Sequence, residues 1–145
     1  AIPEFGFEPA KVDQVFNDED VLKLGDVAIT ALLTNGHTRG STTFVMKVTD
    51  EGQSFTVVFP NGTSVNPGYR VAKDPSYPGI REDYQRTLRI LEDLKPDIWL
   101  MAHTEAFNYD AKLARAAKEG AKAWVDPEGY RKWIIAQKKN FDAAI

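Results

Sequence analysis

Two stretches of this chain are apolar on both faces of the strand that each would form. They are Ala31-Leu32-Leu33 and the run from Phe55 to Phe59. Strands of this kind are typical of sheets that are covered on both faces. The sequence therefore predicts a layered α/β structure, in which helices cover one face of the sheet and something else covers the other.

The first sixty residues have the alternation that is typical of strands. Five runs are predicted as strands, and acidic or glycine-containing turns separate several of them; the runs are residues 12–16, 21–24, 27–33, 42–48 and 54–59. Phe44, Met46 and Val48 fall on one side of the fourth run. Asp50-Glu51-Gly52 is predicted to join the last two as a hairpin.

The rest of the chain is predicted to be mostly helical. Residues 60–79 are rich in proline and glycine and indicate a loop, while residues 98–101 are short and apolar, as in a buried strand. Ile80, Tyr84, Leu88 and Leu91 form one helical stripe. A second helix is predicted over residues 108–120, with Gly120 at its C-cap. Asp126-Pro127 predicts the start of a third helix, which would bury Tyr130, Trp133, Ile134, Gln137 and Phe141.

This order predicts an α/β fold in one domain over residues 1–145, a mixed β-sheet with the three helices on one face. The chain opens Ala1-Ile2-Pro3 without a methionine, which favours a processed, engineered or cut start. Nothing in this pattern says what covers the second face of the sheet.

Composition excludes several classes of function. The net charge of −3 offers no basic surface for nucleic acid or anionic lipid. No apolar run approaches the roughly 20 residues that span a bilayer, so neither a nucleic acid nor a membrane is an expected partner. The absence of cysteine excludes disulfides and thiolate metal ligands. Gly-x-Ser-x-Gly, P-loop and dinucleotide-binding motifs are also missing.

The chain has only two histidines, and each follows an apolar, strand-like run. His37 lies in Gly36-His37-Thr38-Arg39-Gly40, and His103 lies in Met101-Ala102-His103-Thr104-Glu105. Both loops look like the rim of a metallohydrolase site, but a catalytic zinc usually takes three protein ligands. Two histidines cannot supply them, so the sequence indicates half of an enzyme. The alternative is that each is a surface or hydrogen-bonding histidine.

Several segments together resemble the metallo-β-lactamases, in particular their third, di-zinc subclass. Residues 33–44, which read Leu-Thr-Asn-Gly-His-Thr-Arg-Gly-Ser-Thr-Thr-Phe, resemble the histidine loop and following strand of that group. Residues 63–69 resemble its substrate-facing loop, and residues 77–84 resemble the start of its next helix. His103, in Ala-His-Thr-Glu-Ala-Phe-Asn, matches its last zinc-ligand histidine. The His-x-His-x-Asp-His signature of the first half is absent from this chain.

The resemblance implies the C-terminal half of an αβ/βα sandwich whose metals lie at the seam between two halves. It implies that His37 contributes one ligand to a first zinc and His103 one ligand to a second zinc, of two in the complete enzyme. The complete enzyme would hydrolyse β-lactams and confer antibiotic resistance. This chain alone would have no catalytic residues and would be inactive. The family is typically exported, which implies a periplasmic or secreted parent protein.

Thr63 and Ser64 are the predicted substrate-binding residues, because in the resemblance hydroxyls on this loop bond a β-lactam carboxylate or a water molecule of the site. Turn residues of these types also commonly bond their own backbone, and the sequence leaves both readings open. Three functions remain: an inactive half of a zinc hydrolase that needs the missing N-terminal half, a fragment that buries its sheet face in a homodimer, and a nonenzymatic binding module.

Overall fold

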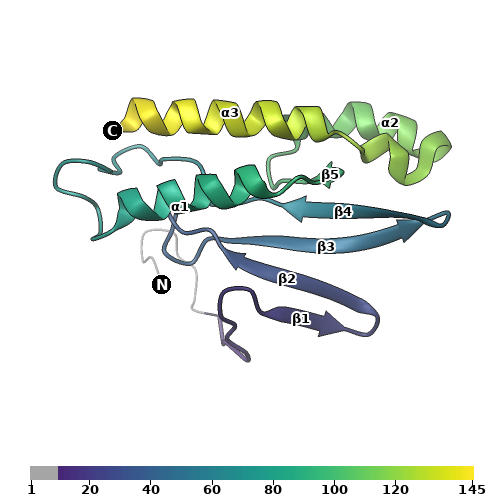
Figure 1. The fold of residues 1–145 in the computed structure, drawn as a ribbon, viewed down its shortest axis with the longest axis horizontal. Helices are drawn as coiled ribbons and strands as arrows, with labels where there is room; N and C mark the ends of the chain where they lie inside the picture. Colours follow the sequence, from purple (N-terminus) through teal and green to yellow (C-terminus); the bar gives the residue numbers. More distant parts are fainter. Residues whose placement is uncertain (1–9) are drawn as a thin grey trace.

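The computed structural model describes residues 10–145, and the expectation about the chain start, Ala1 to Pro3, lies outside them. The elements of this part of the chain are β1 Val21–Leu24, β2 Val27–Leu33, β3 Thr42–Asp50, β4 Gln53–Phe59, α1 Ile80–Asp93, β5 Ile98–Trp99, α2 Tyr109–Glu119 and α3 Pro127–Ala144, with short 3-10 helices η2 Thr104–Phe107 and η3 Gly120–Trp124 (Figure 1). In this part, none of the helices is long and apolar enough to cross a membrane.

The five strands form one mixed sheet in the order β1-β2-β3-β4-β5. The first four pair antiparallel, and β5 pairs parallel to β4. Strands β2, β4 and β5 therefore run in the same direction, and the loops that follow them leave from the same end of the sheet. This confirms the predicted mixed sheet, and it brings together three loops that are far apart in the sequence.

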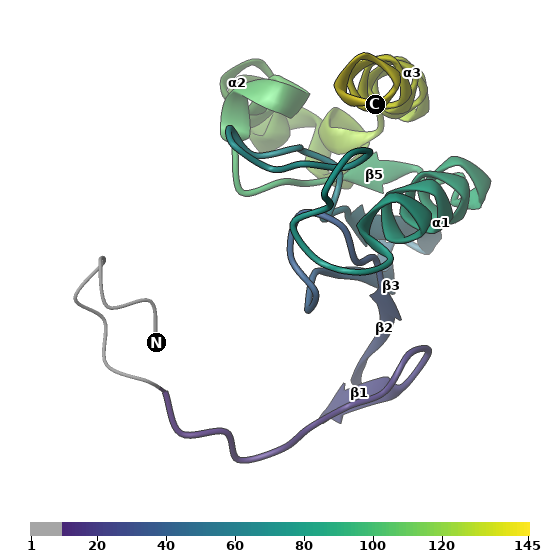
Figure 2. The same cartoon turned by 90° about the vertical axis from the view of Figure 1, so that its left-hand side faces the viewer.

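Helices α1 and α3 lie together on one side of the sheet, as the view along its edge shows (Figure 2). Trp99 of β5 lies beneath them and packs against Leu91, Tyr130 and Ile134. The predicted stripe of α1 is buried, and its residues Tyr84 and Leu88 pack against Phe141 of α3. The predicted mixed sheet with helices on one face is confirmed, with α1 and α3 over this face and α2 beyond the β5 edge of the sheet (Figures 1 and 2).

The opposite face of the sheet carries a continuous set of apolar side chains, which we call the open face. Cross-strand register and packing place these side chains together: Phe44, Met46, Val48, Phe55, Val57, Phe59 and Ile98. Trp124 and Ala121 of η3 cover one end of this set. Elsewhere an apolar groove of about 520 Å³ lies between β3, β4 and the segment after β5. The described residues cover this face only in part, because Phe55, Val57 and Ile98 are buried whereas the other four side chains are half-buried.

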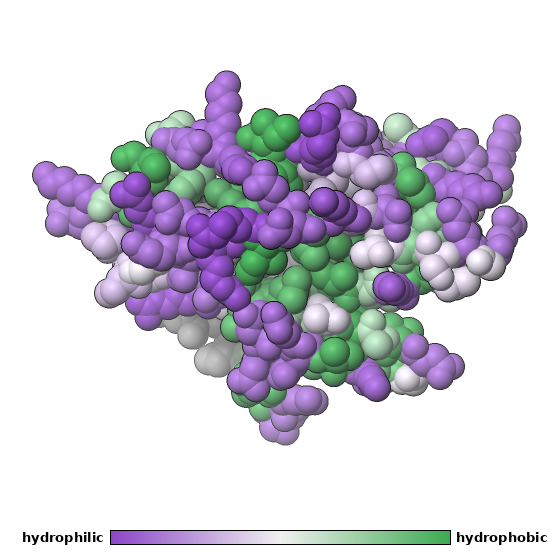
Figure 3. Space-filling model, viewed as in Figure 1, coloured by the Kyte–Doolittle hydropathy of each residue, from purple (hydrophilic) through white to green (hydrophobic). Residues whose placement is uncertain are grey.

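The helical side looks different. Mostly hydrophilic residues cover the helices there, and hydrophobic residues are visible below them, over the strands (Figure 3). Val21 of β1, which the register places on this side, is exposed, and Val27 of β2 is exposed on the side of the open face. The hairpin of β1 and β2 therefore extends past the helical layer instead of packing beneath it.

Residues 12–16 do not form the predicted strand. This segment is irregular, and Val12 and Val15 are 71% and 81% exposed. Its alternating apolar residues have no neighbouring strand with which to pair, because β1 itself is the edge of the sheet. Phe16 instead packs edge-on against Phe44, with 6.3 Å between the ring centroids.

A buried ion pair joins α2 to the start of α3. The Lys112 side chain is only 5% exposed, and its Nζ donates to Asp126 Oδ2 at 2.8 Å. The same Nζ lies 5.6 Å from the ring centroids of Trp99 and of Phe107. Asp126 also caps α3 as predicted, because its Oδ1 accepts from the Gly129 N–H at 2.9 Å. The pair therefore joins α2 to the start of α3 next to Trp99 of β5.

We expect acid to weaken the Lys112–Asp126 ion pair between α2 and α3. Burial raises the pKa of Asp126, but the hydrogen bonds from Lys112 and Gly129 and the Lys112 charge outweigh it and hold that pKa below its ordinary value. A carboxyl with a depressed folded-state pKa stabilises the fold above its unfolded pKa, and this contribution is lost as the pH falls through the lower value. The urea midpoints of wild type and Asp126→Asn should therefore converge below about pH 4. A difference that is unchanged from neutral pH to strong acid would contradict this.

Candidate functional site

The three loops that leave the same end of the sheet carry all of the predicted site residues. The loop after β2 holds His37, the loop after β4 holds Thr63 and Ser64, and the segment after β5 holds His103. All four residues line one depression of about 770 Å³. Trp133 and Gln137 of α3 also line it, as do apolar residues of the sheet end. The topology therefore brings the predicted residues together.

His37 is half-buried, and one of its ring nitrogens is already engaged. Its Nδ1 lies 2.8 Å from the Ser64 carbonyl oxygen and 2.9 Å from Ser64 Oγ. Because a carbonyl can only accept, Nδ1 must carry the proton and donate to it. In the neutral ring, Nε2 then has the free lone pair, and no described residue hydrogen-bonds it. This arrangement is typical of histidines that bind metal through Nε2.

Helix α1 holds both the loop that carries His37 and the loop that carries Ser64. Arg86 and Thr87 donate to the carbonyl oxygens of Leu33 and Asn35, at 2.5 Å and 2.6 Å. Tyr84 donates to the Ser64 carbonyl at 2.8 Å. Burial raises the pKa of the Tyr84 hydroxyl to about 12, with a smaller contribution from Tyr69, so the hydroxyl remains a donor. Sequence analysis placed Tyr84 only in the apolar stripe, since nothing in the spacing shows where a hydroxyl points.

Two glycines allow these loops to approach one another. Gly36 has φ +141°, and a Cβ there would lie 2.8 Å from the Tyr84 ring. Gly62 has φ +88°, and a Cβ there would lie 1.9 Å from the Thr34 carbonyl oxygen. Both positions combine a backbone conformation that disfavours side chains with a close contact. Glycine is therefore required at both positions for the loop that carries His37 to pack against Tyr84 and against the loop after β4.

His103 differs from His37, because nothing in the described part of the chain orients it. Its side chain is 80% exposed, and it stands at the N-terminal boundary of η2. Its Nδ1 lies 3.9 Å from Glu105 Oε1, which is too long for a hydrogen bond. The two histidines share one depression, yet only one of them has a fixed ring.

Thr63 and Ser64 have different surroundings. Thr63 is 5% exposed, whereas Ser64 is exposed and uses both its carbonyl and its hydroxyl at His37. Both residues line the depression. Their role in substrate binding stays a prediction, and for Ser64 the structure adds a contact with the candidate metal ligand.

The donors fit zinc in kind but not in number. Imidazole is a preferred zinc ligand, and catalytic sites use three protein ligands. Within residues 10–145, no three His, Cys, Asp or Glu side chains are grouped so that they could hold a metal ion. His37 and His103 therefore fit a zinc site only as contributors to a larger set of ligands.

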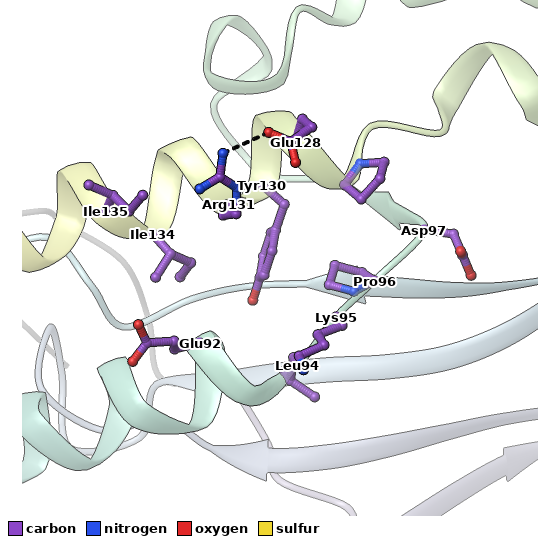
Figure 4. A pocket seen from close by; sticks show the side chains of 11 residues that line it. Glu92, Leu94, Lys95, Pro96, Asp97, Glu128, Tyr130, Arg131, Ile134 and Ile135 are labelled. Carbon is purple, nitrogen blue, oxygen red and sulfur yellow. Dashed lines mark hydrogen bonds and ion pairs between the residues drawn. The ribbon is translucent and has the colours of Figure 1, made fainter.

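A second hollow, of about 520 Å³, lies between the C-terminal end of α1 and the first half of α3. Figure 4 shows Tyr130 and Ile134 on its α3 side and the Arg131–Glu128 pair at its rim, where the two side chains lie 2.9 Å apart. No histidine lines this hollow. The depression with the two histidines is the candidate site.

Comparison with known proteins identifies the class of fold. No family model matches the chain. A metallo-β-lactamase from Legionella gormanii, FEZ-1, is 36% identical, with a TM-score of 0.88, over 94% of this chain and 52% of that one. The subclass B3 enzyme BJP-1 from Bradyrhizobium japonicum is 29% identical, with a TM-score of 0.85, over 94% and 52% of the two chains. The class B3 di-zinc enzyme LRA-12 from an Alaskan soil metagenome is 30% identical, with a TM-score of 0.86, over 95% and 52%.

The described chain thus has the metallo-β-lactamase fold, and its neighbours in that fold include subclass B3 enzymes. It spans about half the length of the solved structures that it matches. The predicted resemblance is confirmed, and the match fits a C-terminal half of such an enzyme.

Proposed function

We propose that this chain is the C-terminal part of a zinc-dependent β-lactam hydrolase, of the kind that gives antibiotic resistance. The observation that carries the proposal is the orientation of His37, whose Nδ1 donates to the Ser64 carbonyl and leaves Nε2 free beside the second histidine loop. Three similar proteins that are named metallo-β-lactamases support the reaction class.

In the complete protein, His37 would hold one zinc through Nε2 and His103 would hold a second. Zinc, when bound, supplies Lewis acidity for polarising a carbonyl group. Thr63 and Ser64 lie on the wall of the same depression, where their hydroxyls can bond the carboxylate of a β-lactam. Trp133 and Gln137 line the same depression from α3.

We propose that the missing N-terminal half is the partner of this chain and that the open face is where it packs. The apolar residues of the open face resemble the inner face of a sheet in a sandwich. Phe44, Met46, Val48 and Phe59 are only half-buried in the described chain, and a partner that packs on this face would remove their remaining apolar surface from water. Since the partner also carries the remaining zinc ligands, the isolated chain should not hydrolyse β-lactams.

The test is complementation. We expect no nitrocefin hydrolysis from this chain alone with zinc, and zinc-dependent hydrolysis after it is mixed with the N-terminal half of the Legionella gormanii enzyme, because the ligand set is then complete. Each half alone with zinc is the control, and light scattering reports whether the halves associate. Turnover by this chain alone would show that our count of ligands is wrong. Association with zinc uptake but no turnover would contradict the proposed reaction.

An alternative is favoured by the open face itself: the chain is a self-associating fragment or nonenzymatic module in which a second copy replaces the missing half. A two-fold dimer would use the same patch on both copies. Light scattering of the chain alone distinguishes the two cases. A stable dimer that excludes the N-terminal half would favour the alternative, and a monomer at micromolar concentration would reject it.

We also propose, by resemblance alone, that the parent protein is periplasmic or secreted. Immunodetection of the parent protein in periplasmic and culture fractions tests this, and recovery only from the cytosol would reject it.

A further inference from the structure

We propose that Tyr84 is a positioning residue for His37, acting through the backbone carbonyl of Ser64. The inference deepens the proposed function, since it concerns the ring that would bind zinc, but its test needs neither zinc nor a β-lactam. The juxtaposition that carries it is one carbonyl oxygen that accepts from both side chains, each at 2.8 Å.

The shared carbonyl links the helix layer to the candidate site. Tyr84 lies on α1 and is fully buried, whereas His37 and Ser64 lie on separate loops at the end of the sheet. The Tyr84 hydroxyl donates to the Ser64 carbonyl oxygen from α1, and His37 Nδ1 donates to the same oxygen from the loop after β2. Because the carbonyl has two lone pairs, it satisfies both donors at once. The exposed loop at Ser64 is thus tied to a rigid helix.

The Tyr84 ring is itself held in place. It packs against Phe141 of α3, with 5.5 Å between the ring centroids. Gly36, directly before His37, lies so close to the Tyr84 ring that a Cβ there would come within 2.8 Å of it. Tyr84 therefore contacts the His37 loop with its ring and the Ser64 loop with its hydroxyl. Its place is dictated by packing and not by the single hydrogen bond.

This geometry dictates which imidazole nitrogen is available. With the Ser64 carbonyl fixed, the Nδ1–H tautomer of His37 has a partner and the Nε2–H tautomer has none at that oxygen. Ser64 Oγ, at 2.9 Å, can accept from Nδ1–H or donate to a bare Nδ1, so it does not discriminate between the tautomers. The carbonyl discriminates, and Tyr84 holds the carbonyl.

The experiment is a long-range proton–nitrogen NMR spectrum of the 145-residue chain, recorded at a pH where imidazole is neutral. We expect the Nδ1–H form of His37 to predominate in wild type, with His103 as an internal reference that lacks a fixed partner. Tyr84→Phe removes the hydroxyl and keeps the ring. In that variant the ratio of Nδ1–H to Nε2–H should fall roughly fivefold, the change in equilibrium that one typical hydrogen bond provides.

Two variants serve as controls. Tyr77→Phe also removes a tyrosine hydroxyl, which donates to Asp83 at 2.9 Å, and should leave the His37 tautomer unchanged. Ser64→Ala removes Oγ and keeps the carbonyl, so the Nδ1–H form should persist. A predominant Nε2–H form in wild type would overturn the inference without any variant. An unchanged ratio in a folded Tyr84→Phe would also overturn it, whereas absence of hydrolysis in the complementation assay would bear only on the proposed function.

Discussion

Gly62→Ala should destabilise the chain by about 3 kcal/mol or more, because the added methyl group would clash with the Thr34 backbone. A Cβ at this position would lie 1.9 Å from the Thr34 carbonyl oxygen, which is far inside van der Waals contact. The backbone at Gly62 also has φ +88°, which side chains rarely adopt. Neither loop can move away cheaply, because Thr34 is fully buried and its hydroxyl bonds that of Thr43. Equilibrium unfolding in urea, followed by circular dichroism, measures the effect.

The matched control is Gly68→Ala. Gly68 has φ +85°, close to that of Gly62, but a Cβ there would have no neighbour within 4 Å. Its cost should be the conformational strain alone, about 1 kcal/mol. The difference between the two variants isolates the steric term. Equal losses of stability would show that the contact with Thr34 does not restrict the loop.

The strands and helices were largely predictable because their apolar residues repeat at the right periods. The hairpin at Gly52 and the cap at Asp126 were confirmed for the same local reasons. Residues 12–16 show the limit of this reasoning. Alternation predicts that a segment can form a strand, but a strand also needs a neighbour, and the edge position of β1 is set by tertiary pairing that no local pattern contains.

The candidate site was predictable only in part. The positions of His37 and His103 after apolar runs indicated two loops that look like the rim of a metallohydrolase site, and the strand pairing puts both loops at one end of the sheet. The contributions of Tyr84, Arg86 and Thr87 were not predictable. Each looks like an ordinary helix residue, and its donor meets a carbonyl oxygen on a loop that is distant in sequence. Hydrogen bonds of this kind follow from how α1 lies against the loops, which periodicity does not determine.

The second large effect concerns the histidines, in the protein assembled with its N-terminal half. His37→Ala should lower zinc-dependent nitrocefin hydrolysis more than about 100-fold, because loss of a partner that merely orients a ligand already costs 10–100-fold. His103→Ala should have an effect of the same order. If the protein is a di-zinc enzyme like its neighbour LRA-12, each variant should also retain less zinc after dialysis than wild type, and the double variant least of all.

The control is Lys139→Ala, on an exposed position of α3, which should change neither activity nor zinc content. The two histidine variants should differ in one respect. Because Ser64 already holds the His37 ring, replacing His37 removes the better ordered of the two proposed ligands, and zinc should be lost at a lower chelator concentration than from His103→Ala. If both variants keep full zinc and full activity, neither histidine is a ligand, and the structural likeness to the metallo-β-lactamases would not extend to their chemistry.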